Sequence, residues 1–149
     1  MIAIRASEAR DERFVIASWL SSWRDSYSAG LIQDADWFTV MWPQLEKLLA
    51  RPGVRCLVAA DTDEPEHVAD LFGFVAADTS RPTPLLLYVY VKQAYRRAGL
   101  ARRLLEAVGV DPGGRFEYAC KQPLPAALFA KVPYARWNPL AARYPKRER

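Results

Sequence analysis

The sequence predicts an α/β fold in which a central sheet is flanked by helices, and two observations predict it. Apolar residues recur with the period of two typical of strands in some segments, and with the helical period of about 3.6 in others. These segments follow one another in the order strand, two helices, three strands, helix, strand and helix. With 149 residues, 51% of them hydrophobic and 26% charged, the chain has the composition of one globular domain, expected to span residues 1–149.

The first part of the chain predicts one strand followed by two helices. Residues 2–6 alternate apolar with polar or small side chains, which indicates a half-buried strand. Ser7 is expected to cap the first helix, which ends near residues 27–30 and whose apolar face carries Ile16, Trp19, Leu20 and Trp23. A second helical pattern covers residues 37–49, and Pro43 must kink that helix or restart it.

Three strands are predicted next. Residues 54–60 and 68–76 are two apolar runs joined by a polar hairpin loop at residues 61–65. Residues 85–91 are apolar at every position, which is typical of a central strand that is buried on both faces.

The last part of the chain predicts a helix, a strand and a second, short helix. The helical pattern of residues 100–108 ends at a glycine, and a turn at residues 111–114 leads to a strand at residues 115–119. Residues 124–131 could form a short helix. From about residue 133 onward three prolines predict an irregular, basic tail.

The net charge of +4 conceals an asymmetry between the two halves of the chain. Residues 1–75 hold seven Lys and Arg against twelve Asp and Glu, a balance of −5, whereas residues 76–149 hold fourteen against five, a balance of +9. If the halves separate in space, one surface suits a cation and the other an anion.

Cysteine, histidine and hydropathy exclude several classes of protein. Cys56 and Cys120 are too few for a disulfide scaffold, and with His67 they offer no metal-ligand spacing. The longest apolar run, residues 85–91, is too short to cross a bilayer. We therefore expect a cytoplasmic protein without a metal and without a membrane partner.

The segment after the central strand carries the clearest chemical signal. Gly99 allows close approach of a ligand to the backbone, and Ala101 keeps the start of the next helix uncrowded. The free N–H groups of a helix N-terminus bind phosphate. The surrounding positive charge comes from Arg96, Arg97, Arg102 and Arg103. An ordinary loop followed by a solvated basic helix would have the same composition.

In this context the segment resembles the signature of the GNAT superfamily of acyl-CoA acyltransferases. That signature is Arg/Gln-x-x-Gly-x-Gly/Ala after a long hydrophobic strand and at the start of a helix. Here it is Arg96-Arg97-Ala98-Gly99-Leu100-Ala101, preceded by Tyr95 and followed by a pair of leucines. The order of elements also agrees, so the resemblance implies a mixed, mostly antiparallel sheet and acetyl-CoA as cofactor.

The resemblance implies a role for each part of this segment. The backbone N–H groups of residues 97–102 would hold the coenzyme A pyrophosphate, and the pantetheine arm would pair with the strand near residues 88–91. An acceptor amine would attack the thioester directly, with a strand amide near residues 89–91 stabilising the oxyanion. The implied cofactor-binding residues are Val89, Val91, Arg96, Arg97, Ala98, Gly99, Leu100, Ala101 and Arg102.

Proton transfer is where the chain departs from the family pattern. Many members place a glutamate on the central strand, and here Glu117 or Asp70 on neighbouring strands are the carboxylates to inspect as a base. Phe129 occupies the position of the family's thiolate-protonating tyrosine and cannot donate a proton. Tyr134 or Cys120 is then the candidate acid, although packing in the place of the family's Phe is the preferred interpretation of Tyr134.

The resemblance implies an acceptor site between the first two helices. The predicted substrate-binding residues are Tyr27, Asp34 and Trp37, and the acidic loop there would favour a cationic amine on a small molecule or a protein. Two alternatives remain open, namely a nucleic-acid-binding or nucleic-acid-modifying protein that uses its basic C-terminal half, and a catalytically silent module. The chain is expected to be a monomer or a homodimer.

Overall fold

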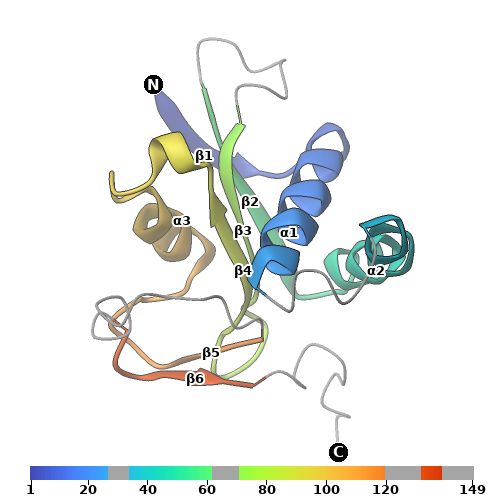
Figure 1. Ribbon diagram of the computed structural model, residues 1–149. Coiled ribbons are helices and arrows are strands. Elements are labelled where there is room, and N and C mark those ends of the chain that lie inside the picture. The colour runs from blue at the N-terminus through green and yellow to red at the C-terminus, as the bar shows by residue number, and fades with distance from the viewer. Residues whose placement is uncertain (27–33, 62–70, 120–131, 139–149) are drawn as a thin grey trace, which may run out of the picture.

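A computed structural model of the protein describes residues 1–26, 34–61, 71–119 and 132–138. Its centre is a six-stranded sheet whose strands follow the order of the sequence (Figure 1). The first four strands pair antiparallel and the last two pair parallel, so the predicted mixed, mostly antiparallel sheet is confirmed. The strands are β1 (Ile2–Ala6), β2 (Val54–Asp61), β3 (Leu71–Asp78), β4 (Leu85–Val91), β5 (Phe116–Tyr118) and β6 (Ala135–Trp137).

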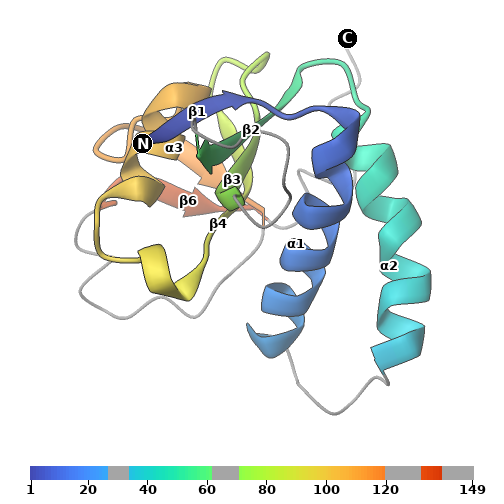
Figure 2. The same cartoon turned by 90° about the horizontal axis from the view of Figure 1, so that it is seen from above.

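Within the described residues, three α-helices cover the two faces of the sheet. Figure 2 shows α1 (Glu12–Ser26) and α2 (Asp34–Leu49) together on one face and α3 (Leu100–Val108) on the other. Each face has its own apolar core: Trp19, Leu20 and neighbouring side chains pack on the α1 side, and Leu104, Val108 and others pack on the α3 side. Burial of these amphipathic faces is the main stabilising contribution to the two layers.

The first helix begins differently from the prediction that Ser7 caps it. A short 3₁₀ helix, η1 (Ala9–Asp11), precedes α1, and its N-cap is Glu8. The Asp11 carboxylate accepts a hydrogen bond from the Glu8 N–H at 2.8 Å and two from the Arg5 guanidinium at 2.6 and 3.0 Å. Burial disfavours the charged carboxylate, but the hydrogen bonds from Arg5 and Glu8 outweigh it and lower the pKa of Asp11.

The second helix is longer than predicted and does not restart at its proline. It begins at Asp34, three residues before Trp37, and continues through Pro43 to Leu49. Pro43 lacks an N–H for the carbonyl of Thr39, but both residues are exposed, so water can take the place of the missing donor.

The predicted irregular tail from about residue 133 is wrong over three residues. Ala135, Arg136 and Trp137 form β6, which pairs in parallel with β5 in the register Phe116↔Ala135 to Tyr118↔Trp137. A strand of three residues is too short to show a periodic pattern in the sequence. It forms because the neighbouring strand β5 supplies its hydrogen-bond partners. The predicted hairpin loop beyond residue 61 and the predicted helix over residues 124–131 lie outside the described residues.

Candidate functional site

The site begins at an irregularity in β4. Ala76 pairs with Tyr88 and Ala77 with Leu86, so Leu87 is an extra residue, a β-bulge, on β4. Leu87 and Tyr88 consequently both face the α1 side, followed by Tyr90, whereas Val89 and Val91 face the α3 side. The bulge therefore determines which side chains of the strand reach each layer beyond this point.

Beyond the bulge β4 has no register partner in β5. Only Leu85 and Leu86 pair with β5, which ends at Tyr118. On its other edge β4 pairs with β3. The Lys92 N–H donates to the Phe72 carbonyl at 2.8 Å, and Tyr90, two residues earlier, pairs with Phe74, so the backbone groups of Tyr90 and Lys92 are directed toward β3. Because hydrogen-bonding directions alternate along a strand, the backbone groups of Val89 and Val91 are directed toward the β5 side of β4.

A compact loop connects β4 to α3. It contains the 3₁₀ helix η3 (Gln93–Tyr95), and the Arg96 Nε–H donates to the Val91 carbonyl at 2.8 Å, which ties the loop to the end of the strand. Arg97 and Gly99 both have left-handed backbone conformations, with φ of 68° and 76°. Left-handed residues at the end of a loop turn successive N–H groups to one side and form an anion-binding concavity.

The start of α3 leaves its first backbone donors available for a ligand. The first hydrogen bond of the helix runs from the Arg103 N–H to the Gly99 carbonyl at 3.1 Å, so the N–H groups of the preceding turn have no intrahelical acceptor. A Cβ built on Gly99 would meet nothing within 4 Å. The loop is therefore open to a ligand at Gly99, and the positive end of the helix dipole favours an anion there.

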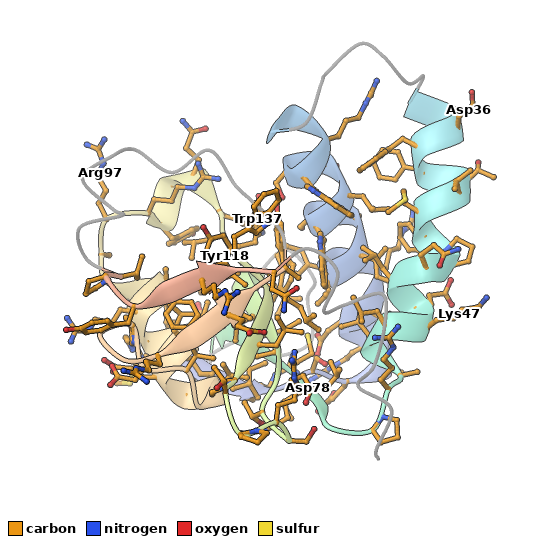
Figure 3. All side chains as sticks on the ribbon, turned by 90° about the horizontal axis from the view of Figure 1, so that it is seen from below. Asp36, Lys47, Asp78, Arg97, Tyr118 and Trp137 are labelled. Carbon is orange, nitrogen blue, oxygen red and sulfur yellow. The ribbon has the colours of Figure 1, made fainter. Side chains whose placement is uncertain are left out.

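The basic side chains around this turn differ in their contacts with the rest of the protein. Arg102 pairs with Glu106 at 2.9 Å, and Arg103 donates to the Ile2 carbonyl at 3.3 Å. Arg97 extends away from the ribbon (Figure 3). The Leu100 side chain is buried, so only the backbone of that residue is available to a ligand.

A pocket lies on the other side of β4, against α1. It has a volume of about 340 Å³ and is lined by Ala17, Ser18, Ser21, Ser22, Tyr90 and Arg96. We call it the serine pocket. Ser18, Ser21 and Ser22 share one face of α1 because they are three and four residues apart. No single motif marked them beforehand; the only sequence signal was this polar stripe beside the apolar face of the helix.

A hydrogen bond joins Ser22 of the serine pocket to a buried tyrosine of β4. The Ser22 hydroxyl lies 2.6 Å from the Tyr88 hydroxyl and also contacts the Ser18 carbonyl at 2.7 Å. Tyr88 is buried and stacks on Trp19 with ring centroids 5.0 Å apart. This arrangement fixes α1 against β4 next to the pocket.

The structure brings only some of the predicted site residues together. Val91 and the loop residues Arg96 to Arg102 lie together at the end of β4, with Val89 on the adjoining part of the strand. Trp37 packs on α1, where its indole N–H donates to the Leu20 carbonyl at 3.0 Å, and it does not line the serine pocket.

The two predicted catalytic side chains lie away from the serine pocket. Glu117 pairs in register with Leu85 at the start of β4, about 20 Å along the strand from Val91 at about 3.3 Å per residue. Its carboxylate accepts a hydrogen bond from Asn138 at 3.0 Å and contacts Arg81 at 3.5 Å. Tyr134 is 62% exposed, just before β6.

The remaining predicted residues lie outside the described part of the chain. These are Tyr27, Asp70, Cys120 and Phe129, together with the side chain of Asp34, whose backbone begins α2. Asp36, in the acidic segment predicted to attract a cationic amine, is exposed on α2, far across the view from Arg97 (Figure 3).

Within the described residues, the start of α3 has N–H groups without an intrahelical acceptor, it lies beside the part of β4 that has no register partner in β5, and a polar pocket lies on the other face of the sheet. This arrangement suits a phosphate-containing ligand next to a second small molecule. The family model that matches the chain is the acetyltransferase (GNAT) family, over residues 16–108. The chain belongs to this family. No curated protein sequence matches it.

Solved structures share the fold. An acetyltransferase-family protein from Pyrococcus furiosus is 16% identical, with a TM-score of 0.61, over 88% of this chain and 90% of that one. A predicted acetyltransferase from Clostridium acetobutylicum, solved with acetyl-CoA, is 13% identical with a TM-score of 0.61 over 88% of each chain. A GNAT acetyltransferase from Staphylococcus aureus Mu50 is 16% identical, with a TM-score of 0.51. The match covers 72% of this chain and 63% of that protein.

Family membership confirms the predicted class of enzyme, a GNAT-type acyltransferase, and the predicted cofactor, since acetyl-CoA is the acyl donor of this family. Within the described residues no helix is long and apolar enough to cross a membrane. The same part of the chain contains no group of three or more residues suited to hold a metal ion.

Proposed function

We propose that the protein transfers an acetyl group from acetyl-CoA to a primary amine bound in the serine pocket. The observation that carries this proposal is the position of Arg96. Its Nε–H is bonded to the end of β4, its backbone leads into the anion-binding turn on the α3 side, and its side chain lines the serine pocket on the α1 side. A donor and an acceptor held on these two sides would meet at the end of the same strand.

The residues present fit coenzyme A. The N–H groups of residues 97–102 would receive its pyrophosphate, since the turn is open at Gly99 and lies at the positive end of α3. The β5-facing backbone of β4 near Val91 would receive its amide-containing arm, as an added strand would. When bound, acetyl-CoA supplies the acetyl group as an activated thioester.

The pocket residues would act by holding the acceptor. In the proposed transfer a bond would form between the amine nitrogen and the acetyl carbon while the bond from that carbon to sulfur breaks, and the proton lost by the nitrogen would pass through water to the departing thiolate. Such a transfer needs no protein nucleophile, because orientation of the two reactants can contribute roughly 7–11 kcal/mol to lowering the barrier. The thiol of the leaving group has a pKa of about 8.5, so its anion is tolerable without an acid beside it.

The test is thiol release coupled to cofactor binding. The purified protein is titrated with desulfo-CoA by calorimetry, and thiol release from acetyl-CoA is followed with a panel of primary amines. Micromolar binding together with amine-dependent thiol release would support the proposal. Binding without release for any amine would leave a silent module, and absence of binding would refute the proposal.

A further inference from the structure

Hydrogen-bond donors outnumber acceptors among the side chains of the serine pocket. Among the described residues, the lining contains a guanidinium, three serine hydroxyls and a phenol, and none of these six lining residues is an Asp or Glu. The Ser22 hydroxyl is already engaged by Tyr88 and by the Ser18 carbonyl. Within the described residues the hydroxyls of Ser18, Ser21 and Tyr90 have no protein partner.

Arg96 differs from the paired arginines of the molecule. Arg5, Arg81 and Arg102 each contact a carboxylate, of Asp11, Glu117 and Glu106 respectively. Arg96 donates only from Nε, to a neutral carbonyl, and no carboxylate in the described part of the chain faces it. Four of its five N–H groups are therefore left for a ligand.

The Arg96 side chain is exposed and borders the serine pocket, on the face of the sheet proposed for the acceptor. The backbone donors of residues 97–102 belong to the turn that leads into α3, whereas the Arg96 side chain borders the pocket together with Tyr90 and the serines of α1. Tyr90 belongs to the apolar cluster of the α1 face, which is opposite to α3. A guanidinium beside hydroxyl donors is the set that binds a carboxylate or another oxyanion.

We propose that the acceptor is a small amine that also carries an oxyanion, such as the carboxylate of an amino acid, and that Arg96 binds this group. The inference rests on the proposed acetyl transfer and names the substrate class of that site. A pocket of about 340 Å³ is at the small end of the range for small-molecule sites and has room for a free amino acid. The sequence-based expectation of a cationic amine concerned the acidic segment between α1 and α2, of which residues 27–33 lie outside the described part of the chain.

The test compares acceptors that differ only in this group. Each of a panel of amino acids is assayed for thiol release beside its amide and beside the amine that lacks the carboxylate. We expect kcat/KM for the best amino acid to exceed that for its amide by about tenfold or more, since hydrogen bonds to charged groups are the strong ones. Equal or better use of the amides and plain amines would overturn the inference while leaving acetyl transfer intact.

Two variants test whether Arg96 causes the expected preference for an amino acid over its amide. Arg96→Gln should reduce the ratio of acid to amide to about one and change the Kd of desulfo-CoA by less than about threefold, because the proposed pyrophosphate site consists of the backbone N–H groups of residues 97–102 and not of the Arg96 side chain. Arg13→Gln, which removes an exposed arginine elsewhere on α1, should retain the wild-type ratio. A large loss of desulfo-CoA affinity in Arg96→Gln, or an equal loss for acid and amide, would place Arg96 on the cofactor side and refute the inference.

A measurement without turnover separates this inference from the function itself. Calorimetry of the amino acids on protein saturated with desulfo-CoA reports acceptor binding directly. Should no amine release thiol, amino-acid binding that is lost in Arg96→Gln would still support an oxyanion site here, whereas absence of binding would refute it. Failure of desulfo-CoA to bind the wild type would refute the proposed function instead.

Discussion

A carboxylate placed at Gly99 tests the anion-binding turn most directly. Nothing lies within 4 Å of a Cβ built on Gly99, so a short side chain has space there. The φ of 76° is left-handed, so the substituting residue must also adopt that backbone conformation. Asn and Asp are the non-glycine residues that adopt this conformation most readily. The pair Gly99→Asp and Gly99→Asn therefore has the same shape and the same backbone strain but differs by one negative charge.

The expected difference follows from electrostatics. One unit charge at roughly 6 Å from a pyrophosphate of charge about −2 is repelled by about 1.4 kcal/mol if the dielectric constant is that of water, about 80. This corresponds to about a tenfold difference in Kd between the two variants. The value is a lower bound, since the effective dielectric constant near a protein surface is smaller. At about 1 M salt the Debye length is about 3 Å, so most of the difference should disappear.

The measurement is calorimetric titration of desulfo-CoA into both variants at about 20 mM and about 1 M NaCl, with thermal unfolding as a check on the fold. The same pair of substitutions at Gly113, in an exposed turn where a Cβ makes only an ordinary contact, is the matched control and should leave the Kd unchanged. Equal affinity of the two Gly99 variants at low salt would refute the assignment of this turn to the pyrophosphate.

Three further predictions concern the pocket, the fold and the thiol. Ser21→Phe should fill part of the serine pocket and raise the KM of the acceptor about tenfold or more, while the Kd of desulfo-CoA stays within about twofold of the wild-type value. Ser21→Ala is the control. An unchanged KM in Ser21→Phe would exclude this pocket as the acceptor site. Asp11→Asn should lower the free energy of unfolding by about 2 kcal/mol at pH 7 in urea titrations, because the Arg5 pair is lost. The folded pKa of Asp11 is below its ordinary 3.8, so this contribution should be present above that pH and lost below it; a difference that persists at pH 2 would contradict the assignment. Burial raises the pKa of Cys56 to about 11, so in a Cys120→Ser background iodoacetamide at pH 8 should modify native protein about 100-fold more slowly than protein in guanidinium, as followed by mass spectrometry; equal rates would show that the thiol is not shielded.

The elements with strong local signals were predictable from sequence, and the site was predictable only in part. β4 and α3 have the predicted bounds, since one is a continuous apolar run and the other an amphipathic pattern between two glycines, Gly99 and Gly109, that both adopt positive φ. The turn that we propose binds the pyrophosphate lies between these two elements. The serine pocket was not predictable from the sequence, because it combines residues about 70 positions apart whose proximity depends on how α1 packs on the sheet.

The bulge at Leu87 shows why the sequence of β4 could not reveal the site. In a regular strand of this sequence, Tyr88 and Tyr90 would face α3 while Val89 and Val91 would face α1, because side chains alternate strictly. One extra residue reverses that assignment for the rest of the strand: Tyr90 enters the wall of the serine pocket, and Val89 and Val91 pack toward α3. Since every residue from Leu85 to Val91 is apolar or aromatic, no polar alternation in the sequence marks the reversal. The same bulge therefore decides which side chains of β4 would meet the proposed acceptor and which of its backbone groups would face the proposed cofactor.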